Sequence, residues 1–202
     1  MIRHKIAKQF YFKTSVVALA IVSACATAQK PTVDPTAPGT TTVYIVRHAE
    51  KSTMIPADPD PDISSTGQRR AEALASRLGT AAVTAIITTQ FKRTQETAQP
   101  LAAALRIEPE IIPAGLQGSS DSVAAAVLRH RGGKVLIVSH SLTIAGIIEA
   151  LGGPRLPNLC DNQYSNLFVM YIPASGKPDL TRQHYGARDP APDQACQEMQ
   201  AR

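Results

Sequence analysis

The sequence predicts an α/β protein with a mostly parallel central sheet and helices on both faces. Two observations lead to this fold class. Short runs rich in β-branched residues, typical of buried parallel strands, alternate along the chain with segments whose apolar residues recur at helical spacing. No internal repeat interrupts this alternation. A β-α-β-α order of this kind indicates one sheet that is covered by helices on both sides.

Each element is predicted from the spacing of its apolar residues and from the residues that end it. Apolar residues at positions 71, 74, 75 and 78 share one helix face, and Gly79 follows directly. Pro100 is expected to kink or restart its helix, and Pro109 places a short strand at a sheet edge. The expected strands are 41–47, 83–88, 107–112, 134–139, 167–172 and a further 180–185. The expected helices are 65–78, 92–105, 121–130 with Ser119 or Ser120 as its cap, and 141–151, which Gly152-Gly153-Pro154 ends.

Composition and charge restrict the class of protein. A length of 202 residues suits one domain that buries its own core, and 44% hydrophobic with 18% charged residues is typical of a globular chain. The formal net charge of +5 comes mostly from residues 1–24, which hold four basic residues and no acidic one. The rest of the chain, with 17 basic and 16 acidic residues, is nearly neutral. This charge distribution, together with the few aromatic residues, argues against binding to nucleic acid.

The first 24 residues have the layout of a secretory signal. A basic start is followed by an uncharged apolar run at residues 16–22 and by small residues. Seven helical residues span about 10 Å, against roughly 30 Å of hydrocarbon in a bilayer, so a permanent membrane span is not expected. We therefore expect an exported chain that resides in the periplasm.

Val22-Ser23-Ala24-Cys25 resembles the bacterial lipobox, whose cysteine is lipidated and becomes the first residue of the mature chain. The resemblance implies a signal peptide of the lipoprotein type over residues 1–24, and membrane contact only through a lipid on Cys25. Ordinary cleavage after Ala26 or Ala28 is the alternative, since both positions follow the small-x-small pattern.

Three further segments follow from composition. Residues 25–40 contain three prolines among Thr and Ala and predict an extended Pro/Thr-rich tether. The folded domain is expected over residues 41–188, with a C-terminal tail over 189–202. In an oxidising compartment, a disulfide is expected between Cys160 and Cys196, and it would pin this tail. Two free thiols are the alternative, and no CxxC motif or Cys/His cluster indicates zinc.

Two histidines and two arginines lie where predicted strands end. Arg47 and His48 come at the end of the first expected strand, His140 follows the fourth, and Arg93 opens the helix after the second. The carboxyl ends of parallel strands form the edge where α/β proteins bind ligands. Guanidinium groups match the charge and geometry of phosphate oxygens, so the four residues predict a cationic pocket for a tetrahedral oxyanion. Taken singly, each could be structural, and Arg93 could be a solvated residue at a helix start.

Four segments of the chain resemble motifs of the histidine phosphatase superfamily, also called phosphoglycerate-mutase-like, and they occur in the family's order. Residues 46–51 (VRHAEK) resemble the strand-Arg-His-Gly-Glu signature, and residues 138–141 (VSHS) the Ser-His-Gly strand end. Residues 63–71 (ISSTGQRRA) are similar to the Leu-Thr-x-x-Gly-x-x-x-Ala segment, and residues 88–98 (TTQFKRTQETA) to the Ser-x-x-x-Arg-Ala-x-x-Thr-Ala segment. The resemblance covers residues 41 to 185 and implies a phosphoglycerate-mutase-like fold.

This resemblance implies a phosphoric monoester hydrolase of the histidine acid phosphatase type, which uses neither a metal nor another cofactor. His48 would attack phosphorus and become phosphohistidine, which requires a neutral ring nitrogen, and the nearby arginines should disfavour the imidazolium. Arg47, Arg93 and His140 would hold the phosphoryl oxygens and neutralise the transition state. Ser141 replaces a glycine of the family, and its hydroxyl could contact the phosphate.

The general acid is less well defined by the resemblance. Many relatives supply a glutamate after the third strand to protonate the leaving oxygen, but residues 111–118 contain no carboxylate. Asp121 is the next carboxylate, and it could equally stabilise a helix N-terminus. Glu50 lies close to His48 in the sequence but could instead serve to orient Lys51 or an arginine. Without a strong acid, good leaving groups are expected, such as phosphohistidine, acyl phosphates, anhydrides or aryl phosphates.

The expected partner is a phosphorylated small molecule, an envelope sugar or a phosphoprotein. The missing acid keeps a non-catalytic phosphate-binding envelope lipoprotein open as an alternative, and a mutase-type phosphotransferase is a second one. Asp58, Asp60 and Asp62 alternate with prolines near the expected mouth of the site. They could repel polyanionic substrates or bind a cation, but a solvated Pro/Asp connection is the favoured interpretation.

Overall fold

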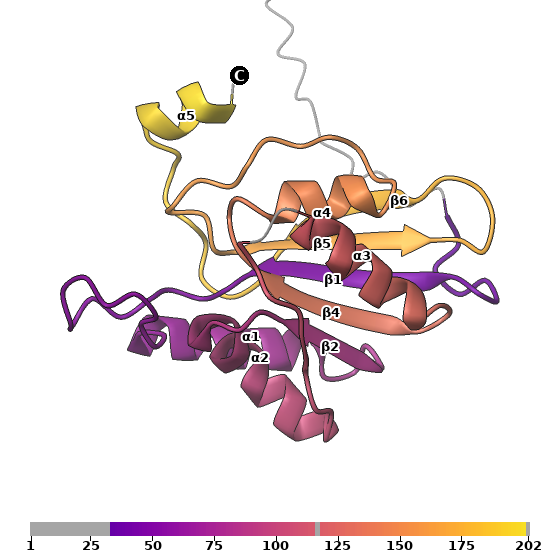
Figure 1. The fold of residues 1–202 in the computed structure, drawn as a ribbon, viewed down its shortest axis with the longest axis horizontal. Coiled ribbons are helices and arrows are strands. Elements are labelled where there is room, and N and C mark those ends of the chain that lie inside the picture. The colour runs from indigo at the N-terminus through magenta and orange to yellow at the C-terminus, as the bar shows by residue number, and fades with distance from the viewer. Residues whose placement is uncertain (1–32, 116–117, 201–202) are drawn as a thin grey trace, which may run out of the picture. The chain divides into compact units, whose positions relative to one another are not determined.

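A six-stranded sheet forms the centre of the structure, a computed structural model that describes residues 33–115 and 118–200 (Figure 1). The strand order is β3-β2-β4-β1-β5-β6. The strands are β1 (Thr41–Arg47), β2 (Ala85–Thr88), β3 (Glu110–Ile111), β4 (Lys134–Ser139), β5 (Asn166–Ile172) and β6 (Asp179–His184). The helices are α1 (Ser65–Leu78), α2 (Lys92–Leu105), α3 (Ser119–Arg129), α4 (Ile144–Ala150) and α5 (Gln194–Gln200).

Strands β1 to β4 run parallel, so their carboxyl ends lie at one edge of the sheet. β1 pairs in parallel with β4 and antiparallel with β5, while β2 lies between β3 and β4 in parallel pairing. The register sets Arg47 opposite Ser139 and Ile87 opposite Ile137. The residues that directly follow β1, β2 and β4 therefore emerge together, where open α/β sheets bind ligands. The expected fold class is confirmed, and β5 and β6 form its antiparallel part.

Apolar side chains on the two faces of the sheet form two separate cores. Because successive strand residues point to opposite faces, Ile137 lies in one core and its neighbour Leu136 in the other. Helices α3 and α4 cover the first face, with Ile148 buried against it. Helices α1 and α2 cover the second face through Leu74 and Leu101 (Figure 1). Burial on both faces explains why the parallel strands are almost continuous apolar runs in the sequence.

The start of α1 packs against the loop that follows β1. Ser64 caps the helix, because its hydroxyl accepts a hydrogen bond from the backbone N–H of Gly67 at 3.1 Å. Gly67 lies so close to this loop that an added Cβ would clash with the carbonyl oxygen of Glu50. Glycine is therefore required at this position, and the contact fixes the backbone just beyond His48 against α1.

The expected serine cap of the third helix is wrong, and so is one of the two alternatives for Pro100, a restart of the helix. Helix α3 begins at Ser119, so neither Ser119 nor Ser120 caps it; Gly118 precedes the helix instead, with φ at 80°. This left-handed conformation suits glycine, which has no Cβ to clash. Helix α2 contains Pro100 and continues from Lys92 to Leu105 without a restart.

The remaining elements differ from prediction mainly in length. Residues 141–143 form a turn after β4, in which the hydroxyl of Thr143 accepts a hydrogen bond from the backbone N–H of His140 at 3.2 Å. This turn delays the start of α4, which is shorter than expected at both ends. Strand β3 has only two residues and begins after Pro109. It lies at the edge of the sheet, as predicted.

The two chain termini test the predicted domain organisation only in part. The predicted signal segment with Cys25 lies outside the described residues, as does the first half of the predicted tether, residues 25–32. Within the described part, no helix is long and apolar enough to cross a membrane. The predicted C-terminal tail contains α5, and a disulfide joins Cys196 of this helix to Cys160 in the loop before β5.

Candidate active site

The four site residues predicted from the sequence lie together at the carboxyl edge of the sheet. His48 follows β1 and His140 follows β4, and the centroids of their rings are 5.4 Å apart. Arg47 is the last residue of β1, and Arg93 is the second residue of α2. Burial lowers the pKa values of both histidines most, and the charges of both guanidinium groups lower them further. The four side chains therefore form one electrostatic group.

Arg47 is almost fully buried, with 3% of its surface exposed. Its Nη1 donates to the backbone carbonyls of Cys160 and Asp161, both at 2.9 Å, and its guanidinium stacks on the ring of Tyr164, 4.1 Å from the centroid. The exposed Asp161 carboxylate lies 3.6 Å from Nη2 and contributes little in water. Burial lowers the pKa of Arg47, yet a guanidinium stays charged at neutral pH. The loop before β5 therefore holds a charged group inside the protein.

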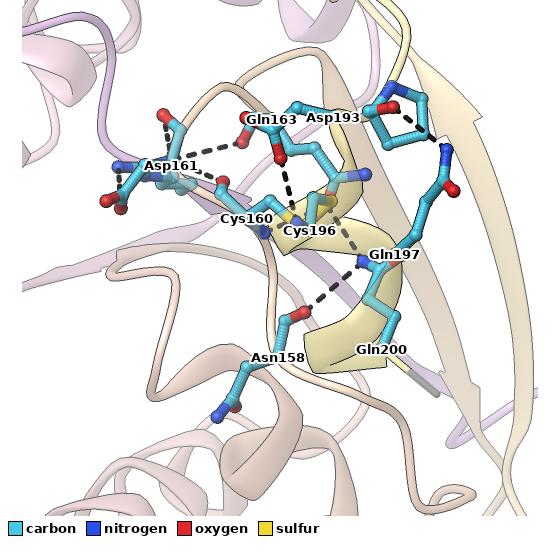
Figure 2. The surroundings of a disulfide bond; sticks show 10 residues. Asn158, Cys160, Asp161, Gln163, Asp193, Cys196, Gln197 and Gln200 are labelled. Atoms are coloured by element: carbon cyan, nitrogen blue, oxygen red, sulfur yellow. Dashed lines mark hydrogen bonds and ion pairs between the residues drawn. A yellow bond between two sulfur atoms is a disulfide. The ribbon is translucent and has the colours of Figure 1, made fainter. Parts of the chain in front are cut away.

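The loop that holds Arg47 is itself attached to α5. The disulfide joins Cys160 to Cys196, and the backbone N–H of Cys160 donates to Oε1 of Gln163 at 3.0 Å (Figure 2). From α5, Nε2 of Gln200 donates to the same Oε1 at 3.1 Å and to the carbonyl of Asn158 at 3.4 Å. The C-terminal helix thus supports the active site through this loop.

His48 is 4% exposed, and one of its ring nitrogens has a fixed partner. Nδ1 lies 2.8 Å from the carbonyl oxygen of Ala49, and because a carbonyl only accepts, Nδ1 carries the proton. In the neutral ring, Nε2 then keeps a free lone pair. Burial is the main cause that lowers the pKa of His48 to about 3. The hydrogen bond to Ala49 raises this pKa, whereas Arg47, His140 and Arg93 lower it further. The imidazole is therefore neutral at physiological pH. The sequence predicted that the nearby arginines would lower the pKa of His48, and in the structure burial lowers it more than they do.

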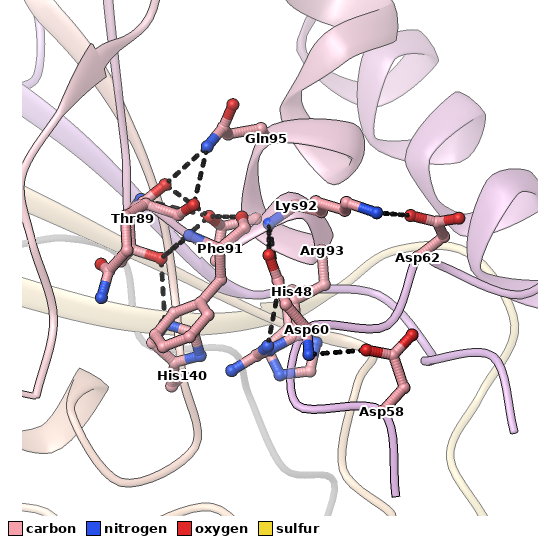
Figure 3. A network of polar contacts seen from close by, with 12 residues as sticks. His48, Asp58, Asp60, Asp62, Thr89, Phe91, Lys92, Arg93, Gln95 and His140 are labelled. Carbon is pink, nitrogen blue, oxygen red and sulfur yellow. Dashed lines mark hydrogen bonds and ion pairs between the residues drawn. The ribbon is translucent and has the colours of Figure 1, made fainter. Parts of the chain in front are cut away.

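His140 contacts two residues from the segment that follows β2. Its Nε2 lies 3.1 Å from Oγ1 of Thr89, and the ring of Phe91 packs edge-on with 5.4 Å between centroids (Figure 3). Burial lowers the pKa of His140 to about 4, and nearby cations, Arg93 first, add to the effect. A bound phosphoryl group would oppose these causes and favour the protonated imidazole as a donor. Thr89 was not predicted as a site residue. Its position directly after β2 is the feature of the sequence that could have indicated it.

Arg93 lies at the mouth of the site with a 14% exposed side chain, so it is not the solvated residue of the alternative interpretation. Its guanidinium stacks on Phe91, 4.2 Å from the ring centroid, and its Nη1 lies 3.3 Å from Oδ1 of Asp60. In the described part of the chain, Nε of Arg93 and Nε of Arg47 are buried without a hydrogen-bond partner. A buried donor without a partner costs about 1–3 kcal/mol. An oxyanion between the arginines would satisfy both.

The two predicted general acids are paired or exposed. Both carboxylate oxygens of Glu50 accept from Nε of Arg70 at 2.9 Å, and Oε1 also accepts from Nη2 at 2.8 Å. Arg70 further donates to the carbonyls of Tyr185 and Ala187, so the pair ties the loop after β1 to α1 and to the segment after β6. Of the roles expected for Glu50, the structure supports the orientation of an arginine. Asp121 is exposed in the first turn of α3.

Asp60 is a site residue that the sequence did not single out. Its Oδ1 accepts from the backbone N–H of Lys92 at 3.1 Å as well as from Arg93, and its own N–H donates to Asp58 at 3.0 Å (Figure 3). The loop is a partly solvated connection, as interpreted, and Asp60, with a 34% exposed side chain, also pairs with Arg93. The alternation of Asp and Pro indicated a loop near the site, but a partner 33 residues away could not be inferred from it.

Ser141 is buried beside a cavity of about 560 Å³, which Leu142, Leu159 and Asn162 also line. The backbone carbonyl of Ser141 accepts from the N–H of Leu159 at 3.2 Å, so the turn after β4 is held against the loop before β5. Neither His48 nor His140 lines this cavity, so its link to the site is Ser141, the residue after His140. Among the described residues, no group of three or more His, Cys, Asp or Glu side chains is arranged to hold a metal ion.

Fold and site together define a class of protein: an α/β sheet with two histidines and two arginines at its carboxyl edge. Residues 43–115 match the family described as the histidine phosphatase superfamily (branch 1). This part of the chain is therefore similar to the histidine phosphatase superfamily, in agreement with the resemblance of its sequence motifs. A comparison with curated proteins gives no match.

Solved structures share the fold. The protein histidine phosphatase SixA, complexed with tungstate, has a TM-score of 0.57 at 17% identity, over 71% of this chain and 96% of that chain. A mycobacterial glucosyl-3-phosphoglycerate phosphatase has a TM-score of 0.54 at 15% identity, over 65% and 90%. A phosphoserine phosphatase mutant from Entamoeba histolytica, in complex with phosphoserine, has a TM-score of 0.50 at 17% identity, over 70% and 95%. The expected phosphoglycerate-mutase-like fold is therefore confirmed.

Proposed function

We propose that this chain is a phosphatase that hydrolyses a phosphate ester or a similar phosphoryl group through a covalent phosphohistidine on His48. One observation carries the proposal: Nδ1–H of His48 is bonded to the carbonyl of Ala49, which leaves the Nε2 lone pair of a neutral imidazole free beside two arginines. Both arginines keep a buried Nε–H that has no partner in the described part of the chain. An uncharged nucleophile next to unsatisfied cationic donors suits attack on a phosphoryl group.

The reaction proceeds in two displacements. In the first, Nε2 of His48 forms a bond to phosphorus in line with the departing oxygen. Arg47, Arg93 and His140 hold the other phosphoryl oxygens and neutralise the charge of the loose transition state. In the second, water attacks phosphorus, the P–N bond breaks and its electron pair returns to Nε2. The hydrogen bond from Nδ1 to Ala49 keeps the imidazole in one orientation through both steps.

The proposed substrate is a phosphorylated small molecule, an envelope sugar or a phosphoprotein. Among proteins of this fold, one is a protein histidine phosphatase and another is a glucosyl-3-phosphoglycerate phosphatase, so both protein and sugar substrates occur. Ser141, which follows His140 in the sequence, lines a cavity of about 560 Å³ that is large enough for the remote part of a small-molecule substrate.

We also propose that the chain is exported and that Cys25 carries a lipid anchor. The basic and apolar first segment and the lipobox-like residues 22–25 support this proposal. The disulfide between Cys160 and Cys196 agrees with an oxidising compartment. Cys25→Ala should release the chain from the membrane fraction of the cell, and unchanged association with membranes would refute the lipid anchor.

The test of the phosphatase activity is hydrolysis of an aryl phosphate by the full chain, kept in detergent with a metal chelator. Wild-type protein should release the phenol and should carry acid-labile phosphate on His48 when it is quenched during turnover. His48→Ala should lose both properties. His130→Ala is the matched control, because it removes a histidine that lies beside Glu110 on the surface. If the wild-type protein binds phosphate but shows neither turnover nor phosphohistidine, the non-catalytic alternative is correct.

A further inference from the structure

The first displacement leaves negative charge on the departing oxygen of the substrate. A positioned acid that protonates this oxygen accelerates such a step by about 10²- to 10⁴-fold, most for poor leaving groups. Residues 111–118 hold no carboxylate, Asp121 is exposed on α3, and both oxygens of Glu50 are held by Arg70. None of these groups is placed to deliver the proton.

Asp60 is the carboxylate that is paired with Arg93 at the mouth of the site. Its Oδ1 accepts from Nη1 of Arg93 at 3.3 Å and from the backbone N–H of Lys92 at 3.1 Å. Its Oδ2 has a longer contact, 3.3 Å, with the same backbone N–H. The backbone of Asp60 is fixed in turn, because its N–H donates to Oδ1 of Asp58 at 3.0 Å. Oδ2 is therefore the oxygen that is better placed to carry a proton.

We propose that Asp60 is the general acid and base of this site: it protonates the leaving oxygen and then takes a proton from the attacking water. The inference rests on the proposed function of His48. A phosphoryl group that binds Arg93 competes with the Asp60 carboxylate for the same guanidinium, so the carboxyl group lies at the place where the substrate binds.

The proton and electron balance closes over the two displacements. As Nε2 of His48 forms the P–N bond, the bond from phosphorus to the leaving oxygen breaks and its electron pair stays on that oxygen. The oxygen takes the proton from Oδ2, and Asp60 becomes a carboxylate. In the second displacement, this carboxylate takes a proton from water as the water oxygen bonds to phosphorus. The P–N electron pair returns to His48, and protonated Asp60 is regenerated as phosphate forms.

Asp60 also has a structural role that the test must separate from proton transfer. Its carboxylate accepts from the backbone N–H at the first position of α2, the helix that carries Arg93. Asn accepts this type of hydrogen bond about as well as Asp, so Asp60→Asn keeps the acceptor and removes the transferable proton. Asp62→Asn is the matched control, because Asp62 belongs to the same loop and pairs with Nζ of Lys92 in an exposed position.

The experiment measures kcat/KM of both variants over a series of phosphate monoesters, from acidic phenols to simple alcohols, together with the phosphate trapped on His48. Asp60→Asn should retain most of its activity on the most acidic phenol and lose about 10²- to 10⁴-fold on alkyl phosphates. The variant should also accumulate phosphohistidine with the acidic phenol, because water then lacks its base. Asp62→Asn should follow the wild-type protein throughout.

Two results would overturn the inference. An equal loss on every substrate would show that Asp60 only positions Arg93, and full activity on alkyl phosphates would show that the proton comes from elsewhere. Asp60→Ser, which also keeps a cap acceptor, repeats the series if the first variant does not fold. Failure of the proposed function looks different: the wild-type protein itself would then show no turnover and no phosphohistidine with any ester.

Discussion

The backbone carbonyl of Cys160 accepts a hydrogen bond from Nη1 of Arg47 at 2.9 Å, so one half of the disulfide contacts a cation of the active site. The disulfide closes a segment with a sequence separation of 36. Closing a loop of this length restricts the unfolded chain by about 3–4 kcal/mol in the chain-entropy description. The disulfide therefore links the stability of the chain to the position of Arg47 through the loop before β5.

Removing the disulfide should weaken substrate binding as well as stability. In the double variant Cys160→Ser/Cys196→Ser, the carbonyls that hold Arg47 lose a covalent tether to α5. We expect KM for an aryl phosphate to rise about 10-fold. This change corresponds to about 1.4 kcal/mol of binding free energy, which is part of the contribution of one charged hydrogen bond. The free energy of unfolding in urea should fall by about 3–4 kcal/mol. A reductant should reproduce both effects in the wild-type protein and leave the double variant unchanged. An unchanged KM in the folded double variant would show that Arg47 does not depend on the disulfide.

Glu50→Gln distinguishes a general acid from a structural partner of Arg70. The Arg70 side chain is 5% exposed, and a buried charge that loses its partner costs about 3 kcal/mol. We therefore expect a lower free energy of unfolding in urea and, for the folded fraction, the same activity loss on all leaving groups. Glu72→Gln, at an exposed position of α1, is the control. A loss confined to alkyl phosphates would instead identify Glu50 as the acid.

The sequence predicts the parallel strands and the four central site residues because both follow from local pattern. A strand buried on both faces appears as an apolar run, and whatever follows such strands meets at one edge of the sheet. Two contacts of the site could not be found in this way. The pairs Asp60–Arg93 and Arg47–Cys160 join residues 33 and 113 positions apart, through loops whose path has no periodicity in the sequence.

Helix ends show the same limit on a smaller scale. The serines at 119 and 120 have the right chemistry for a cap, but the backbone turns one residue earlier, where Gly118 can adopt positive φ. Pro100 predicts a kink or a restart of the helix, and α2 continues through it without a restart. In both cases the packing of a whole helix on the sheet outweighs the preference of one residue.

Inorganic phosphate should stabilise the folded chain by binding at the two arginines. A ligand of a single site at 100 times its Kd adds about 2.7 kcal/mol to the free energy of unfolding. Arg47→Gln and Arg93→Gln should each remove most of this gain, because each deletes a charged group whose buried Nε–H has no partner among the described residues. Arg155→Gln, which changes an 84% exposed side chain, should keep it. Thermal unfolding at increasing phosphate concentration and constant ionic strength measures the shift of the unfolding temperature. Equal shifts in all variants would place the phosphate at another surface.

Protonation of the two histidines should make stability depend on pH. Burial, as the main cause, lowers the pKa of His48 to about 3 and that of His140 to about 4. In the unfolded chain both titrate near about pH 6.5. Below about pH 6.5 the unfolded chain therefore binds more protons than the folded chain, so the stabilising contribution is fully present above this pH and is lost as the pH falls toward about 4.

Urea unfolding at pH steps from about 7 to about 4.5 measures this dependence, in which each histidine contributes a slope of up to about 1.4 kcal/mol per pH unit. His48→Gln should remove one such contribution, because glutamine does not titrate. Arg155→Gln, which changes an 84% exposed side chain, should keep the wild-type slope. An unchanged slope in His48→Gln would show that the folded site accepts the proton without penalty. His48 would then be charged in mildly acidic solution, and the free lone pair required for attack on phosphorus would be lost there.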